Sequence, residues 1–316
     1  MISWVAANDC PKNFMIRSDF AAFIITYNRP DILQHTIYRI GEQSVSPSTI
    51  LIVNNGDAIP NSLHSSLPGI SIEQCKMQSN VGPSGAANFA LTTLNSRGFQ
   101  WIQWIDDDDP PRVKDLNERL FMYLEKLKSQ KIGIIAPVGS YFNLERGATI
   151  RVKDNEILNN QYLHLHTVGG NQCMIINSSV VDSQCLPTAN LFFGFEETNF
   201  CLKVLNAGYQ IVVPCDLFQE YRSLASRWDL TKSDLRKTRI LPWRNYYSIR
   251  NLIYMFLYEF NKPRVVLYII TRSILKALYG LSRPSNGLRG FYLTILAIKD
   301  GVFKKLGLTV QPLAKH

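Results

Sequence analysis

Several common signatures are absent from this chain of 316 residues. None of its six cysteines belongs to a CxxC pair or to a Cys/His metal spacing, so we expect reduced thiols rather than a zinc site. No run of about 18 or more uncharged apolar residues occurs, and no ordinary membrane span is expected. Residues 1–10 lack the basic and apolar regions of a signal peptide, so the expected location is the cytoplasm.

Acidic residues are scarce in the last third of the chain. Residues 221–316 hold 18 Lys and Arg but only four Asp and Glu, a formal charge of +14. Residues 1–220 carry −5, and the whole chain +9. This division argues against a uniformly basic protein coated on nucleic acid. It indicates two zones with different partners.

The patterns GxGxxG and GxxxxGK[ST] are also missing, which disfavours a Rossmann dehydrogenase and a P-loop NTPase. Short apolar runs alternate instead with segments of helical spacing. This alternation predicts an α/β fold with a mixed, mostly parallel sheet. The predicted strands are 20–26, 49–53, 70–73, 99–105, 131–137, 173–176 and 209–214, and the predicted helices are 31–40, 85–94, 113–128 and 195–207.

Polar clusters follow the first four predicted strands. They are residues 26–30, 54–57, 80–85 and 106–109. Ligands of open α/β sheets bind outside the carboxyl ends of the strands, so these clusters are expected to line one site. This expectation depends on the order of strands and polar segments alone.

Four consecutive acids, Asp106 to Asp109, come directly after an apolar strand. Adjacent carboxylates repel one another, and a bound cation relieves that repulsion. On an extended segment Asp106 and Asp108 would share a face, and their hard oxygen ligands favour Mg²⁺ or Mn²⁺. The alternative is a solvated acidic loop that caps the next helix. The position at a strand's carboxyl end favours the cation site.

A second acidic pair, Glu196 and Glu197, stands at the start of a predicted helix. Acids at this position often only complement the helix dipole. The flanking rings of Phe193 and Phe195 would withdraw a carboxylate from water and raise its pKa, which suits a general base. Both interpretations remain open at this level.

Small residues follow Asn80 through Gly82 to Gly85, near a helix start. Their backbone amides would allow close approach of a sugar nucleotide, although glycine-rich helix starts are common. Separately, His164 and His166 would share a face on a strand, as metal-binding pairs do. No third ligand is near them in sequence, which favours the polar face of an edge strand.

The chain divides at about residue 235 into an expected catalytic domain, 1–235, and a basic, apolar, helical region, 236–316. Residues 252–279 mix Leu, Ile, Tyr and Phe with Arg264, Arg272 and Lys276. Such helices could pack on the catalytic domain with their cations in water. They could also dock on anionic lipid.

Together these motifs resemble the inverting family 2 glycosyltransferases of the GT-A fold. Their order and spacing match across about residues 20–220, and residues 246–251 add to the likeness. The resemblance is strongest to the galactofuranosyltransferase and rhamnosyltransferase branch. The motifs are Thr26-Tyr27-Asn28-Arg29-Pro30, Val53-Asn54-Asn55-Gly56, Asn80-Val81-Gly82, Trp104-Ile105-Asp106-Asp107-Asp108, Gly194-Phe195-Glu196-Glu197 and Tyr246-Tyr247 with Arg250-Asn251.

The resemblance implies a role for each matching residue. Glu197 would be the catalytic base, with Glu196 as the neighbouring candidate. Asp106 and Asp108 would flank Mn²⁺ or Mg²⁺, with Asp107 nearer the donor sugar. Asn55 or Asp57 would lie near the nucleobase. The other implied contacts with the nucleotide sugar are Thr26, Tyr27, Arg29, Asn80, Gly82, Asp106 and Asp107.

One departure concerns the metal. Many relatives carry a His just after the strand that corresponds to residues 211–214, and this chain has none there. Either an oxygen ligand from Asp216, Gln219 or Glu220 substitutes for it, or the Asp cluster and the substrate diphosphate hold the metal alone.

The expected activity is transfer of galactofuranose, rhamnose or another hexose from a UDP- or dTDP-sugar to a hydroxyl of a saccharide. The resemblance implies a lipid-linked acceptor, cell-surface polysaccharide synthesis and a peripheral position at the inner face of the membrane. It leaves a homo-oligomer open. The alternatives are a nucleotidyltransferase of related fold and a non-enzymatic nucleic-acid-binding protein, which would leave the clustered acids without a purpose.

Overall fold

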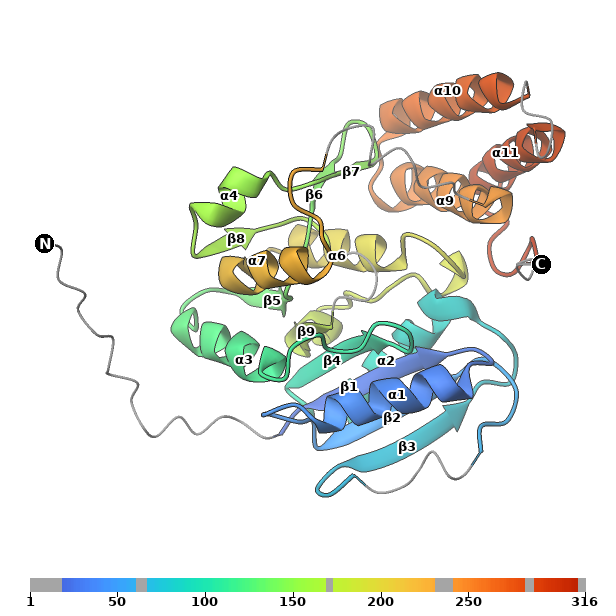
Figure 1. The fold of residues 1–316 in the computed structure, drawn as a ribbon. Coiled ribbons are helices and arrows are strands. Elements are labelled where there is room, and N and C mark those ends of the chain that lie inside the picture. Colours follow the sequence, from blue (N-terminus) through green and yellow to red (C-terminus); the bar gives the residue numbers. More distant parts are fainter. Residues whose placement is uncertain (1–18, 61–66, 169–172, 231–240, 282–286, 312–316) are drawn as a thin grey trace, which may run out of the picture.

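The computed structural model describes residues 19–60, 67–168, 173–230, 241–281 and 287–311. Within them an eight-stranded sheet has the order β3-β2-β1-β4-β9-β5-β10-β8 (Figure 1). Its strands are β1 (Ala21–Thr26), β2 (Thr49–Asn54), β3 (Ser71–Lys76), β4 (Trp101–Asp106), β5 (Ile132–Ile135), β8 (Tyr162–His164), β9 (Met174–Asn177) and β10 (Gln210–Pro214). Strands β6 (Tyr141–Asn143) and β7 (Ala148–Ile150) form a separate antiparallel pair.

The expected mixed, mostly parallel sheet is confirmed. Strand β1 pairs in parallel with β2 and β4, β2 with β3, and β5 with β10. Strand β9 runs antiparallel between β4 and β5, and β8 is an antiparallel edge strand on β10. All residues of β1 and β2 are buried, which explains their continuous apolar runs without alternation.

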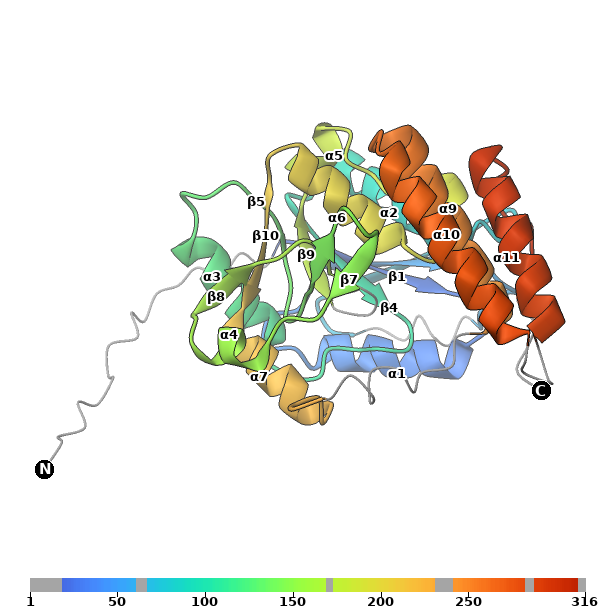
Figure 2. The same ribbon diagram turned by 90° about the horizontal axis from the view of Figure 1, so that it is seen from above.

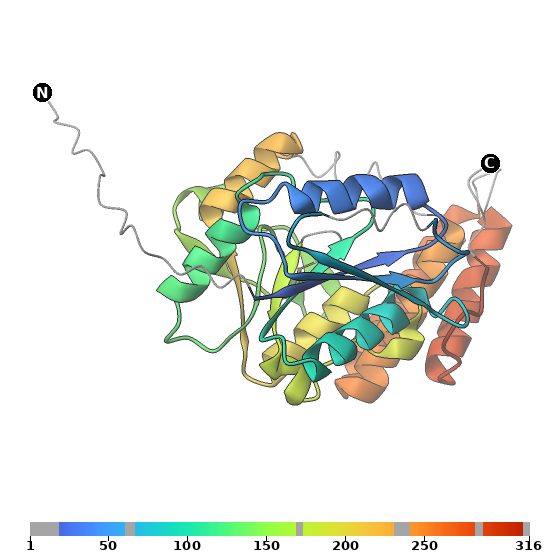
Figure 3. The same ribbon diagram turned by 90° about the horizontal axis from the view of Figure 1, so that it is seen from below.

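Helices cover both faces of the sheet (Figures 2 and 3). Leu33, Leu120 and Leu217 belong to the core on one face, and Ala90 and Phe200 to the core on the other. The first face carries α1 (Pro30–Gly41), α3 (Leu116–Lys126) and α7 (Cys215–Leu224). The second carries α2 (Gly82–Ser96), α5 (Ser179–Asp182) and α6 (Glu196–Asn206). Short helical segments occur at α4 (Asp154–Leu158) and η2 (Ala189–Leu191).

The helical C-terminal region lies beside the sheet at one end of the molecule (Figure 2). Tyr246, Phe256 and Leu293 belong to its own hydrophobic core, which Phe192 and Leu202 join from the α/β part. Its elements are α9 (Pro242–Tyr254), the π-helical segment η3 (Met255–Glu259), α10 (Pro263–Gly280) and α11 (Gly287–Val302). The boundary at residue 235 falls outside the described residues and stays a prediction. None of the described helices combines the length and apolar character needed to cross a bilayer.

Two local features refine the sequence expectations. Helix α2 begins at Gly82, three residues before the predicted start, because Pro83 suits the first turn of a helix. His164 ends the edge strand β8, and the His166 ring lies edge-on to Tyr141 with 5.5 Å between centroids. His164 therefore lies on an edge strand as expected, whereas His166 lies beyond the end of that strand.

Candidate active site

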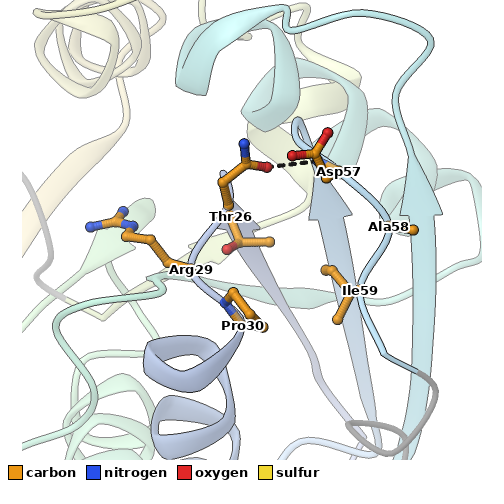
Figure 4. A pocket seen from close by; sticks show the side chains of 7 residues that line it. Thr26, Arg29, Pro30, Asp57, Ala58 and Ile59 are labelled. Carbon is orange, nitrogen blue, oxygen red and sulfur yellow. Dashed lines mark hydrogen bonds between the residues drawn. The ribbon is translucent and has the colours of Figure 1, made fainter. Parts of the chain in front are cut away.

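A pocket of about 240 Å³ opens at the carboxyl ends of β1 and β2 (Figure 4). Its lining includes Thr26, Arg29 and Asp57, three of the residues expected to contact the nucleotide. Tyr27 lies beside them and is 51% exposed. The polar ends of the first two strands therefore meet, as the sequence order predicts.

The pocket's shape depends on two asparagines that close the strands. The backbone N–H of Asp57 donates to Asn28 Oδ1 at 2.7 Å, drawn as a dashed line in Figure 4. Asn54 Oδ1 accepts a hydrogen bond from the Gly56 N–H at 2.8 Å, and Asn54 Nδ2 donates to the Asp57 carbonyl at 2.7 Å. A Cβ on Gly56 would lie 2.0 Å from Asn28 Oδ1, so only glycine allows this approach.

Arg29 joins the pocket to the acidic turn after β4. Its guanidinium forms a short ion pair with Asp107 and bonds Asp108 Oδ2 at 2.6 Å. Thr26 Oγ1 donates to the other Asp107 oxygen at 2.7 Å, and the Asp107 side chain is 1% exposed. Asp107 is thus anchored by protein groups from the end of β1.

Asp106, the last residue of β4, sits in a strongly negative environment. Burial raises its pKa to about 8, and the charges of Glu197, Asp108 and Asp107 add to that rise. Burial also raises the pKa of Glu196, and Asp106 contributes to it. Glu196 Oε2 has no hydrogen-bond partner among the residues that the structure describes. Carboxylates from β4 and α6 therefore gather where a proton or a cation would relieve their repulsion.

No group of three His, Cys, Asp or Glu side chains that could hold a metal occurs in the described residues, so a divalent ion at the acidic turn would have to take further ligands from a substrate. Asp106 and Asp108 supply hard oxygens, and Mg²⁺ typically binds through one or two carboxylates plus phosphates and water. Asp216 and Glu220 both bond Arg119, at 2.8 and 2.6 Å. Gln219 donates to the Ile157 carbonyl at 3.1 Å. All three side chains proposed to replace the His thus already have partners within the protein.

The segment before Glu196 and Glu197 turns sharply into α6. Phe192, Gly194 and Phe195 have φ angles of +64°, +81° and +68°, a left-handed conformation that is uncommon for phenylalanine. Such a turn persists only where surrounding contacts hold it. We call residues 191–194 the base loop.

Helix α9 supplies those contacts. Asn251 Nδ2 lies 3.1, 2.9 and 2.7 Å from the carbonyl oxygens of Leu191, Phe193 and Gly194. Arg250 donates to the Leu191 carbonyl at 2.7 Å, and its guanidinium carbon lies 4.7 Å from the centroid of the Tyr247 ring. Arg250 and Asn251 are both fully buried. The C-terminal region thus holds the base loop from behind.

The same loop contacts the glycine-containing segment on its other side. Gly82 has φ +70°, and a Cβ there would lie 2.0 Å from the Phe192 carbonyl oxygen. Asn55 Nδ2 donates to the Gly82 carbonyl at 3.1 Å, and the Gly82 N–H donates to Asn80 Oδ1 at 2.9 Å. Asn55 is buried. In this structure Asn55 and Asn80 support the loop around Gly82.

The structure therefore brings the expected site residues together in three groups. Thr26, Arg29, Asp107 and Asp108 are directly bonded, with Asp57 across the pocket. Asp106, Glu196 and Glu197 interact through their charges. Asn55, Asn80 and Gly82 form the supporting loop. The sequence had no means of showing that Arg250 and Asn251 contact the base loop. The available signal was the motif of Tyr246-Tyr247 with Arg250-Asn251, which adds to the family resemblance.

Comparison with known proteins identifies the family of the chain. The model of glycosyl transferase family 2 matches residues 21–183, just over half of the chain. The match includes Thr26, Arg29 and residues 106–109 and ends before Glu196. A search of curated proteins gave no match.

Solved structures share the fold at low identity. Staphylococcus aureus TarS 1–349 in complex with UDP-GlcNAc has 12% identity and a TM-score of 0.54, over 90% of this chain and 81% of that chain. GalNAc-T7 with UDP, GalNAc and Mn²⁺ has 10% identity and a TM-score of 0.54, over 90% of this chain and 56% of that chain. The helix-covered sheet is thus that of the GT-A glycosyltransferases, and the family model shows that the chain belongs to glycosyl transferase family 2.

Proposed function

We propose that this chain is an inverting, metal-dependent glycosyltransferase in which Glu197 is the catalytic base. The packing of α6 against β4 carries the proposal: the rings of Phe200 and Trp104 lie with their centroids 6.4 Å apart, and the charge of Glu197 adds to the raised pKa of Asp106. This packing sets the start of α6 against the end of β4, where the Arg29-bound acidic turn begins. A base and a leaving-group site would then face each other across one reaction centre.

The donor would bind at the pocket beside Thr26, Arg29 and Asp57. Arg29 keeps 42% of its side chain exposed while it bonds Asp107 and Asp108. It could therefore contact an anionic diphosphate as well. The UDP and UDP-sugar complexes of the structural neighbours support a nucleotide-sugar donor, and we propose a UDP- or dTDP-sugar.

In the proposed reaction, Glu197 takes the proton from an acceptor hydroxyl as its oxygen attacks the anomeric carbon. The bond from that carbon to the nucleotide diphosphate breaks on the opposite face, which inverts the configuration. Mn²⁺ or Mg²⁺ held by Asp106 and Asp108 would neutralise the departing diphosphate. Glu197 is partly exposed and Glu196 is buried, so Glu197 is better placed to meet an acceptor.

The finer assignments come from the sequence resemblance. We propose a sugar of the galactofuranose or rhamnose type, another hexose being the wider class, and a lipid-linked saccharide acceptor in cell-surface polysaccharide synthesis. The protein would act at the inner face of the membrane as a peripheral enzyme. A homo-oligomer is left open.

The first experiment is thermal unfolding of the full chain with UDP or dTDP, each with and without Mn²⁺. A ligand at a hundred times its dissociation constant stabilises a protein by about 2.7 kcal/mol, a readily measured shift. We expect stabilisation that needs nucleotide and metal together, and none from ATP as the control. No metal-dependent stabilisation by either nucleotide would count against the proposal.

A donor screen then tests the sugar. UDP-galactofuranose, UDP-galactose, UDP-glucose and dTDP-rhamnose are supplied in turn, and released nucleotide is measured. We expect turnover with UDP-galactofuranose or with dTDP-rhamnose. Exclusive use of UDP-glucose or UDP-galactose would contradict the proposed branch.

A further inference from the structure

Helices α10 and α11 expose large apolar side chains in an ordered arrangement. They lie side by side at the outer end of the molecule, away from the sheet (Figures 1 and 2). Tyr279 and Leu288 are 74% and 81% exposed. We call this surface the outer face, and its members are Leu267, Tyr268, Leu275, Leu278, Tyr279, Leu288, Tyr292 and Ile295.

The spacing shows that this exposure is not scattered. Tyr268, Leu275 and Tyr279 follow helical spacing along α10, and Leu288, Tyr292 and Ile295 do so along α11. Isolated exposed apolar residues are ordinary, whereas an aligned set across two neighbouring helices marks an interaction surface.

The charges on these helices have one sign. Five exposed cations accompany the apolar residues, and none of them makes an ion pair within the described residues: Arg264, Arg272, Lys276, Arg289 and Lys299. Asp300 is the one acid in α10 and α11. It is buried and accepts a hydrogen bond from Tyr246 at 2.6 Å. The outer face therefore presents apolar and positive groups without exposed negative ones.

We propose that the outer face docks on an anionic lipid bilayer. This inference rests on the proposed function, which includes a lipid-linked acceptor. It adds to that function by naming the surface of the protein that meets the membrane. Tyrosines favour the headgroup level, leucines would enter the acyl boundary, and each cation contributes about 1 kcal/mol near anionic lipid. A second copy of the chain fits less well, because two outer faces would bring ten unpaired cations together.

The structure also changes which helix would meet the membrane. The sequence assigned the amphipathic surface to residues 252–279. Leu252 and Arg250 are buried in α9, beneath α10 and α11, so α9 belongs to the interior. The membrane surface begins at α10 and extends through α11.

The test is sedimentation of the full chain with vesicles of phosphatidylcholine alone or with phosphatidylglycerol. We expect binding to the anionic vesicles that weakens as salt is raised. The double variant Leu275→Glu with Tyr279→Glu should bind at least tenfold more weakly, and so should Arg272→Glu with Lys276→Glu. Leu158→Glu, at a position 60% exposed on α4, is the matched control and should bind normally.

The same samples separate this inference from the proposed function. All variants should keep their unfolding temperature and the Mn²⁺-dependent shift with UDP, because the outer face lies apart from the pocket. Equal binding by wild type and both double variants, or equal loss in Leu158→Glu, would overturn the docking surface. If the wild type is a dimer in solution and the double variants are monomers, the outer face binds a second copy of the chain and the membrane proposal is overturned. If UDP with Mn²⁺ does not raise the unfolding temperature of the wild type, that result contradicts the proposed activity and leaves the docking surface unaffected.

Discussion

The side-chain amide of Asn251 donates to the carbonyl oxygen of Gly194 at 2.7 Å. Gly194 stands two residues before Glu196, where α6 begins. A helix from the C-terminal region thus fixes the point at which both candidate bases enter the site. Together with the bonds from Asn251 to the Leu191 and Phe193 carbonyls, this contact supports the segment in which Phe192 and Phe195 have positive φ angles.

Replacing Asn251 should therefore impair catalysis more than donor binding. Asn251→Asp retains the size but cannot donate to the three carbonyls, and Asn251→Ala removes both size and amide. Loss of a buried donor costs about 1–3 kcal/mol for each group left unpaired. We expect kcat to fall at least tenfold for both variants, with a smaller change in KM for the donor, measured by nucleotide release.

Ser248→Ala is the matched control on the same helix. Within the described residues, its hydroxyl donates to the Arg244 carbonyl one turn earlier and makes no hydrogen bond to the base loop. It should leave kcat unchanged. If Asn251→Asp also retains wild-type kcat, then the base loop does not depend on α9.

The assignment of the base predicts a second pair of variants. Glu197→Gln should keep Mn²⁺-dependent UDP binding and lose about 10²–10⁴-fold in transfer, because the amide cannot accept the acceptor's proton. Glu196→Gln should lose less, since Glu196 is buried. Binding is followed by thermal shift and transfer by nucleotide release. The reverse ranking of the two variants would move the base to Glu196.

The bridge from Arg29 to Asp107 and Asp108 predicts an effect on stability. Arg29→Lys keeps the charge, but a single ammonium cannot hold both carboxylates in the same way. We expect a loss of about 1–2 kcal/mol, reduced from the value for a buried pair because Arg29 is partly exposed. Urea unfolding measures it.

Arg97→Lys provides the comparison, since Arg97 pairs with Glu73 on the surface. Exposed pairs contribute less, so this change should stay within about 0.5 kcal/mol. Equal losses for the two variants would show that the Arg29 bridge has no special weight.

The environment of Asp106 predicts a pH-dependent stability. Its pKa in the folded protein is raised to about 8, whereas an unfolded Asp titrates near 4, about the usual value. The folded state keeps the proton over this interval, so metal-free stability should fall as pH rises from about 4 to 8. Asp106→Asn cannot ionise and should unfold at least about 2 °C higher at pH 8, with the difference vanishing near pH 4.

Mn²⁺ with UDP should reverse the order, because only the wild type offers the Asp106 carboxylate. Scanning calorimetry at several pH values, with EDTA or with Mn²⁺ and UDP, measures both effects. An Asp106→Asn protein that is less stable than wild type at pH 8 in EDTA would contradict this electrostatic picture.

Local patterns predicted the parts of the molecule that depend on neighbours in sequence. The apolar runs at β1 and β2 indicated buried parallel strands, and the four acids stand at the carboxyl end of β4 as expected, with Asp106 as its last residue. Each of these features follows from the alternation of strands and helices. The antiparallel direction of β9 did not, because an apolar run has the same composition in either direction.

Long-range contacts could not be predicted in this way. The hydrogen bond from the Asn55 amide to the Gly82 carbonyl joins residues 27 positions apart, and no local pattern indicates it. The basic tail looked uniformly available for binding, yet Arg250 is fully buried and Arg222 pairs with Asp154. Lys232, Arg236, Lys237 and Arg239 lie outside the described residues. Charge counts therefore overstate the cations that a surface offers.

The distance along the chain between Gly194 and Asn251 has a consequence for synthesis of the protein. The two residues are 57 positions apart, so the base loop leaves the ribosome well before the helix that holds it. A nascent chain that ends before α9 can form much of the sheet, but it lacks every hydrogen bond from Arg250 and Asn251 to the loop. The active site would thus be completed late, after the C-terminal helices have been made and folded.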